Sequence, residues 1–161
     1  MRLRTMLLWL LGLLVLCSGS YCTSLAASFE DVVAKVDRHG GLAVHVGCRD
    51  ATLARLLKSK GNWIVQLLVR DSDVAAELKK NLVRDGSWGK CTVQVLGKSL
   101  PYVDNTVNLL VLEQADLVSK QEALRVLRPD GVLYLRDGSR WTVIRKPRPS
   151  DIDVWTHFLH D

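Results

Sequence analysis

The chain has 161 residues and a formal net charge of +5, from 22 lysines and arginines against 17 aspartates and glutamates. This mild charge, with no cluster of basic residues interleaved with aromatics, argues against a nucleic-acid-binding protein. Without an N-terminal export signal, the remaining residues are enough for one domain with a single hydrophobic core.

The first 26 residues have the features of an export signal. Arg2 and Arg4 precede an apolar run over Met6–Cys17. Residues 24–26 (Ser-Leu-Ala) fit a small-x-small cleavage site. The run is shorter than the roughly 20 apolar residues that span a bilayer as a helix. We therefore expect an exported protein (periplasmic, in the cell envelope or secreted) that contacts a membrane only through an uncleaved signal.

Strand and helix patterns alternate after this segment. The first half of the chain predicts a helix over 29–40 that ends at Gly40 or Gly41, a strand over 42–46, a helix over 52–59, a strand over 63–69 and a helix over 73–84. The second half predicts strands over 91–96 and 107–112 and a helix over 120–127. A turn over 128–131, a strand over 132–135 and a hairpin strand over 141–144 follow. Connections of a few residues favour a parallel sheet covered by helices. The expected fold is α/β: a single Rossmann-like domain over 27–146 with a doubly wound, mostly parallel sheet.

Cys48 and Cys91 are the two cysteines that follow the leader. The predicted elements place Cys48 just after the first strand and Cys91 at the start of the third. In a parallel sheet these positions lie at opposite ends. We expect two free, partly buried thiols and no disulfide between them.

The turn after the first strand is the place where doubly wound domains hold a nucleotide-like cofactor. Glycines let the chain approach such a ligand, and the N-terminus of the next helix presents free N–H groups. Here Gly47 is followed by Cys-Arg-Asp-Ala at 48–51. The scaffold of a cofactor site is present, and much of its binding chemistry is missing.

Three blocks resemble the class I S-adenosylmethionine-dependent methyltransferases. They are VHVGCRDA at 44–51, LPYVDNTVNLLVL at 100–112 and LRVLRPDGVLYL at 124–135. The resemblance covers roughly residues 41–136 and implies a methyltransferase-like fold. It implies S-adenosylmethionine as the cofactor if the site is retained, with Gly47 and Asp71 as the cofactor-binding residues.

The chain departs from this family where the cofactor should be held. His45 stands at the position of an acidic residue, and the second and third glycines of the turn are Arg49 and Ala51. Val69 and Leu96 stand where the resemblance places acids that meet the ribose hydroxyls and the adenine amine. Their side chains cannot accept hydrogen bonds. The departures predict no cofactor and no catalytic residue, with His45 as a satisfied histidine of the core.

Other polar residues carry weaker signals. Glu113 and Asp116 follow the fourth strand and are the candidates for a substrate-facing role if catalysis survives; a solvated loop is the simpler interpretation. His157 and His160, next to Asp161, form an H-x-x-H-D cluster whose two histidines could ligate a metal, but no third ligand is in view. Packing at a domain junction is favoured there, and no metal site is predicted.

The last eleven residues, DIDVWTHFLHD at 151–161, support a narrower resemblance. Together with the leader and the domain, they are similar to the N-terminal part of large exported planctomycete proteins. In those proteins such a domain precedes a PQQ-binding-like β-propeller. This resemblance implies that 147–161 form a linker and the start of a further domain, whose propeller is the expected partner.

The leading functional hypothesis is an exported, non-catalytic methyltransferase-like domain that serves as a structural or interaction module of a larger protein. One alternative is an active S-adenosylmethionine-dependent methyltransferase of unknown substrate. Another is a Rossmann domain that binds an anion or small ligand, with Arg49 at a helix N-terminus supplying the charge.

Overall fold

A computed structural model describes residues 29–34, 36, 40–138 and 140–150. Six strands form one sheet in the order β3-β2-β1-β4-β5-β6. They are β1 (Gly40–Val46), β2 (Asn62–Val69), β3 (Cys91–Val95), β4 (Val107–Leu112), β5 (Leu127–Asp137) and β6 (Arg140–Arg145). Strands β1 to β5 pair in parallel, and β6 pairs antiparallel with β5. The doubly wound α/β prediction is confirmed.

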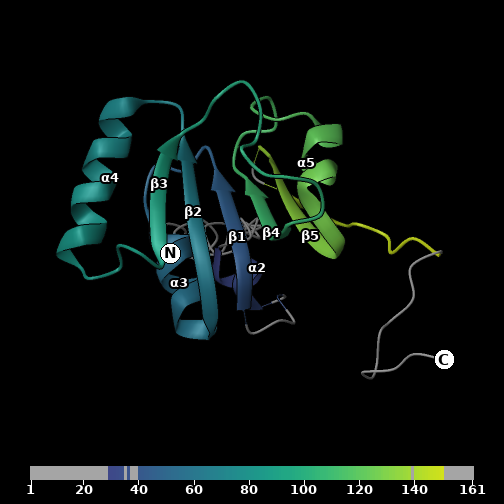
Figure 1. Ribbon diagram of the computed structural model, residues 1–161, viewed down its shortest axis with the longest axis horizontal. Helices are drawn as coiled ribbons and strands as arrows, with labels where there is room; N and C mark the ends of the chain where they lie inside the picture. The colour runs from purple at the N-terminus through teal and green to yellow at the C-terminus, as the bar shows by residue number, and fades with distance from the viewer. Residues whose placement is uncertain (1–28, 35, 37–39, 139, 151–161) are drawn as a thin grey trace, which may run out of the picture.

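Helices lie on both faces of this sheet (Figure 1). They are α2 (Phe29–Ala34), α3 (Thr52–Lys60), α4 (Ser72–Arg84) and α5 (Lys120–Val126). The first three share one core layer with Leu67 and Val111, and α5 shares the other with Leu68 and Leu110. Alternate residues of each central strand thus enter opposite layers. None of the helices in the described part of the chain is long and apolar enough to cross a membrane.

The structure differs from the sequence prediction at the start of β1 and at the start of β5. Gly40 and Gly41 belong to β1 and do not end the preceding helix. Gly41 has φ +129°, and a Cβ there would lie 2.6 Å from the side chain of Asn108. The Asn108 Oδ1 atom accepts a hydrogen bond from the Leu42 backbone N–H at 3.0 Å. The glycine therefore lets β4 approach β1 closely.

The expected turn over 128–131 lies inside β5 and does not precede it. The register with β4 passes from Val107 opposite Leu127 to Leu109 opposite Val132, so the intervening residues bulge out. Backbone hydrogen bonds with Lys146 hold the bulge: the Asp130 N–H donates to the Lys146 carbonyl at 3.0 Å. The hairpin strand expected at 141–144 is confirmed as part of β6.

The connection between β3 and β4 contains no helix, and side chains of α5 hold it in place. Glu122 accepts the Leu100 backbone N–H at 3.1 Å and two hydrogen bonds from Arg125 at 2.7 and 2.8 Å. Arg125 also donates to Asp104 at 2.6 Å and to the Tyr102 carbonyl at 3.0 Å. The hydrogen bonds from Arg125 are the main reason that the pKa of Glu122 lies below its usual value.

We expect Glu122→Gln to flatten the acid side of the stability profile. A lowered folded-state pKa stabilises the protein above the unfolded-state pKa, and this contribution is lost as the pH falls through the folded-state value. The variant should be less stable by roughly 1 kcal/mol at pH 7 and should lose less stability between about pH 5 and pH 3. Urea unfolding across pH measures both effects, with Glu77→Gln on exposed α4 as the control. Parallel profiles for the variant and the wild type would contradict this account.

Candidate functional site

The structure brings the two predicted cofactor-binding residues together at the carboxyl edge of the sheet. Gly47 directly follows β1, has φ +76° and donates its N–H to the Leu68 carbonyl at 2.8 Å. Asp71 caps the N-terminus of α4 by accepting the Asp73 N–H at 2.8 Å. Both residues line a hollow of about 130 Å³ with Cys48, Arg49, Val69, Arg70 and Val74. The predicted positions are therefore neighbours.

The side of Gly47 where a Cβ would stand, away from the residues that line this hollow, is filled by the loop that follows β4. A Cβ atom on Gly47 would lie 2.9 Å from Leu117 Cδ1 and 3.6 Å from Gln114 Cγ. A ligand approaching the turn from this side has to displace the leucine. Sequence reasoning missed Leu117, since nothing in the local pattern of its loop indicates that it reaches the turn after another strand.

The ends of β2 and β3 offer apolar side chains to this edge. Val69 is buried, and its carbonyl accepts the Leu96 N–H at 2.7 Å. Asp71, two residues beyond β2, uses one carboxylate oxygen for the helix cap. The chain thus holds none of the acids that the methyltransferase resemblance requires at the two strand ends. Val69 and Leu96 offer no side-chain hydrogen-bond acceptor at these two positions.

His45 and Glu113 form a buried pair beneath the turn. The His45 side chain is 1% exposed and that of Glu113 is 17% exposed, and Nε2 lies 2.6 Å from Oε1. The ring N–H is not directed at that oxygen, so the contact is close without being an aligned hydrogen bond. Arg136 lies 3.9 Å from the other carboxylate oxygen, and the Phe29 ring meets the imidazole edge-on at 5.3 Å.

This pair corrects two expectations. Glu113 is held over the sheet by its N–H, which donates to the Val46 carbonyl at 3.1 Å, so it is not part of a solvated loop. His45 is a core residue, but its Nδ1 has no hydrogen-bond partner among the described residues, so it is not a satisfied one. Asp116 is exposed, as the simpler interpretation of that loop expected.

The two cysteines are free and buried, which confirms that they do not pair. Burial is the main cause that raises the pKa of Cys48 to about 12, with Glu113 adding to it. Burial likewise raises the pKa of Cys91 to about 11. Because the thiolate is the reactive form, neither residue is poised as a nucleophile.

A neighbouring groove of about 280 Å³ runs between the start of α3 and α4. Arg49 and Arg55 line it, but so do Asp50 and Glu77. Hydrogen bonds from Thr52 lower the pKa of Asp50 despite its partial burial, so this carboxylate stays charged near neutral pH. The mixed charge does not favour the anion-binding alternative.

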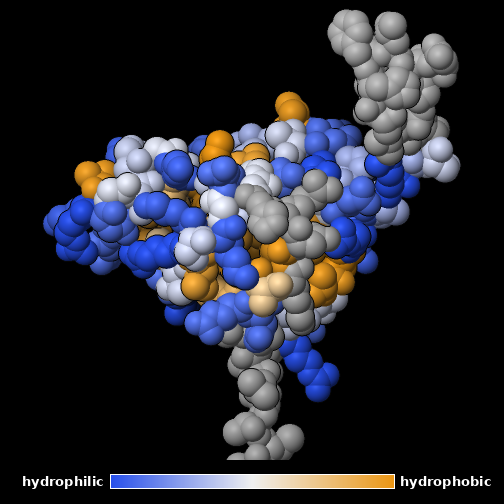
Figure 2. Space-filling model, turned by 90° about the horizontal axis from the view of Figure 1, so that it is seen from below, coloured by the Kyte–Doolittle hydropathy of each residue, from blue (hydrophilic) through white to orange (hydrophobic). Residues whose placement is uncertain are grey.

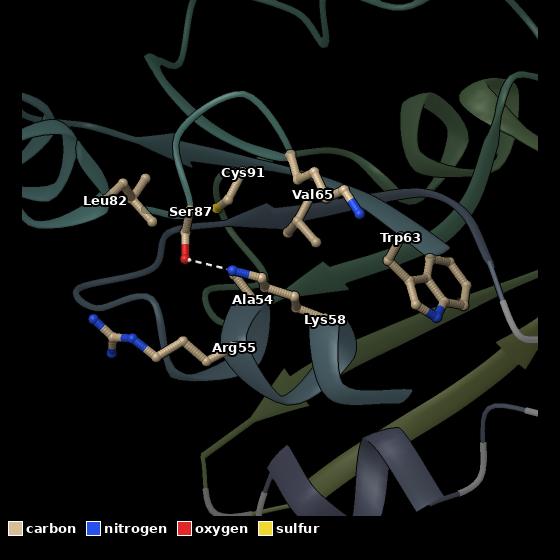
Figure 3. Close-up of a pocket in the computed structure, with 9 residues that line it drawn as sticks. Ala54, Arg55, Lys58, Trp63, Val65, Leu82, Ser87 and Cys91 are labelled. Carbon is tan, nitrogen blue, oxygen red and sulfur yellow. Dashed lines mark hydrogen bonds between the residues drawn. The ribbon is translucent and has the colours of Figure 1, made fainter. Parts of the chain in front are cut away.

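The opposite edge of the sheet is filled. Figure 3 shows Lys58 of α3 reaching Ser87, with Nζ 3.3 Å from Oγ. The space left between these residues, Trp63 and Cys91 is about 10 Å³. That is about the room of a single water molecule. No group of three or more His, Cys, Asp or Glu side chains within the described ranges could hold a metal, and His157, His160 and Asp161 lie outside them.

Solved structures share this architecture. A geranyl diphosphate C-methyltransferase from Streptomyces coelicolor, solved with S-adenosyl-L-homocysteine, matches with a TM-score of 0.61 at 14% identity over 68% of this chain and 44% of that one. The fold is methyltransferase-like. A SAM-dependent methyltransferase from Aquifex aeolicus matches with a TM-score of 0.57 at 17% identity over 67% of this chain and 62% of that one.

One of the solved structures with this fold is named as a cyclase. The cyclase SpnF matches with a TM-score of 0.57 at 24% identity over 65% of this chain and 42% of that one. The present chain spans about half the length of these structures. No family profile and no curated protein matches the sequence.

Both thiols should resist alkylation in the folded protein. At pH 8 we expect iodoacetamide to modify Cys48 and Cys91 at least a hundredfold more slowly than in the unfolded chain, because so little thiolate forms at these raised pKa values. Mass spectrometry of the two peptides, with and without denaturant, measures the ratio. Rapid modification of Cys48 in the native state would show that this thiol is accessible.

Removing one partner of the His45–Glu113 pair should lower the free energy of unfolding. Glu113→Ala should destabilise the protein by roughly 2–4 kcal/mol because it leaves a buried imidazole without its carboxylate. The double variant with His45→Leu should show a coupling energy of roughly 1–3 kcal/mol. Asp116→Ala, in the same loop and exposed, is the control and should stay within about 0.5 kcal/mol. Additive effects in denaturant unfolding would mean that the two residues do not stabilise each other.

Proposed function

We propose that this chain is a methyltransferase-like domain that does not bind S-adenosylmethionine and acts as a non-catalytic structural or interaction module of a larger protein. The observation that carries this proposal is Leu117, whose side chain lies against Gly47 on the side where a Cβ would stand. A cofactor that needs close approach to this turn meets an apolar side chain there.

The electrostatics of the site support the same conclusion. Two ribose hydroxyls without acceptors at Val69 would each lose of order 1 kcal/mol or more. Arg49 would add a cation beside a ligand whose sulfonium is already positive. Each loss of about 1.4 kcal/mol weakens binding tenfold, so several together reduce the affinity by powers of ten.

The shared fold does not require methyl transfer. The cyclase SpnF has this architecture and is named for a different activity. Function in such folds resides in the side chains of the site, and in this chain those side chains have changed. The retained part is the packing of sheet and helices, which is what a structural module needs.

The proposal also includes export of the protein and a partner domain that follows this one in the chain. The leader over residues 1–26 and the segment over 151–161 lie outside the described residues, and the sequence supports both. An exported protein meets little S-adenosylmethionine, because this metabolite is cytoplasmic. The partner that the narrower resemblance suggests is a PQQ-binding-like propeller that follows this domain.

The active methyltransferase is the second candidate, since Gly47 and Asp71 line one hollow. In this alternative Asp71 would accept the ribose hydroxyls with the carboxylate oxygen that does not serve the helix cap. Leu117 would then have to move when the cofactor binds.

Calorimetric titration separates the two candidates. We expect S-adenosylmethionine and S-adenosylhomocysteine to give no binding heat and no thermal stabilisation with the folded full-length chain. Saturable binding tighter than about 100 µM, or roughly −5.5 kcal/mol, would overturn the proposal. Leu117→Ala is the informative variant, because binding gained on its removal would show that the leucine blocks the turn. Leu124→Ala, on α5 and away from Gly47, is the control for nonspecific loosening.

A further inference from the structure

Basic side chains gather at the end of the sheet opposite the Gly47 turn. Helices α3 and α4 both run from the carboxyl edge of the sheet and end beside the starts of β2 and β3 (Figure 1). Exposed lysines and an arginine lie on the second halves of these helices and on the loop before β3. We call this set the basic end: Lys58, Lys60, Lys79, Lys80, Arg84 and Lys90.

Contacts join the two helices at this end of the sheet. The Lys58 amine of α3 lies 3.3 Å from the Ser87 hydroxyl in the loop after α4. Arg55 of α3 pairs with Asp85 of the same loop at 3.2 Å. Lys90 lines the same small space as Lys58. The cations therefore share one surface although they come from separate elements.

The charge of the basic end is not neutralised within the described part of the chain. None of its six side chains forms an ion pair with a described residue, and Glu77, one turn before Lys80 on α4, does not pair with it. Asp85 is already paired with Arg55. The six cations together exceed the formal net charge of the whole chain, which is +5. The attraction of helix carboxyl ends for cations accounts for those in the last turns of α3 and α4 and leaves the other three without an internal anion.

An exposed tryptophan lies among these cations. Trp88 is 40% exposed, and Val83 in the last turn of α4 is 56% exposed. The N–H groups of Ser87 and Trp88 donate to the Leu82 carbonyl at 2.9 and 3.0 Å, so the loop is held in place. Lys79 Nζ lies 5.1 Å from the centre of the Trp88 ring. An exposed tryptophan beside lysines is typical of protein surfaces that lie at a lipid–water interface.

The shape of this surface favours a broad partner. The space beside Lys58 and Ser87 is about 10 Å³, the room of one water molecule, so it offers no pocket for an anchoring side chain. On either side of Trp88, Gly86 and Gly89 have no atom within 4 Å of where a Cβ would stand, so the loop stands clear of its surroundings. Figure 2 shows from below mostly hydrophilic residues on the α4 side, with isolated hydrophobic ones among them. An anionic layer with an apolar interior can meet such a surface without a groove.

We propose that the basic end and Trp88 form a contact surface for an anionic lipid membrane, separate from the leader. The cations lie over the lipid phosphates, and the tryptophan ring lies at the level of the headgroups. Single-stranded nucleic acids carry the same charge but are bound along grooves, so they are the competing outcome of the test. The surface lies at the other end of the strands from the Gly47 turn. The inference therefore goes beyond the absence of cofactor binding, and each can fail without the other.

Vesicle sedimentation with the full-length chain tests the charge. Each cation near an anionic surface contributes roughly fivefold to the affinity. We therefore expect phosphatidylcholine vesicles that contain phosphatidylglycerol to bind at least about tenfold more tightly than vesicles of phosphatidylcholine alone. Lys80→Glu with Lys90→Glu should weaken binding to the anionic vesicles at least about tenfold.

Lys98→Glu with Lys120→Glu is the matched control, because it changes the net charge equally at two exposed residues near the carboxyl edge. Lys98 lies beyond β3, whose 5 residues span roughly 16 Å. That is about twice the Debye length at physiological salt, so this variant should change the affinity less than about twofold. Thermal unfolding followed by circular dichroism checks that all variants are folded.

Brominated lipids test the position of Trp88. Bromine on the acyl chains quenches a tryptophan that reaches the edge of the apolar layer. Anionic vesicles of brominated lipid should therefore quench the fluorescence of the wild type more than that of Trp88→Phe. The leader carries Trp9 in its own apolar run. Its contribution is the same in both proteins and cancels in the difference.

Four outcomes would overturn the proposal. The first is equal binding to anionic and neutral vesicles. The second is that the Lys80 and Lys90 variant binds anionic vesicles as well as the Lys98 and Lys120 variant. The third is that Trp88 contributes nothing to the quenching. The fourth is that a single-stranded oligonucleotide displaces the chain from the vesicles, because a nucleic acid would then be the preferred occupant.

Discussion

The rest of the structure depends on the burial of β1 between two parallel neighbours. β1 pairs with β2 on one side and with β4 on the other, and its second half is buried on both faces. Val44 and Val46 enter one core layer while Ala43 enters the other. This arrangement brings the carboxyl ends of three strands to one edge, and every residue considered for cofactor binding lies there because of it.

The same constraint explains how the polar residues at this edge are arranged. A histidine on β1 would be an isolated buried polar group, and Glu113 at the end of the adjacent β4 supplies the carboxylate that it faces. Leu117 comes from the loop that Glu113 begins, and it lies against Gly47 on the side where a Cβ would stand.

Two core layers cover the two faces of the central strands. The core layer under α5 extends past β4, since Val44 and Val46 of β1 and Leu68 of β2 are buried in it.

The sequence by itself determined the alternation of strands and helices, the parallel sheet and the two free cysteines. These follow from local patterns: apolar spacing and the chain positions of strand ends. Only the tertiary structure decided that Glu113 faces His45, that Leu117 lies against Gly47, and that Ile64 is exposed on an interior strand. Each of these depends on which strands become neighbours and on what covers them. Contacts between residues tens of positions apart leave no periodic signal in the chain.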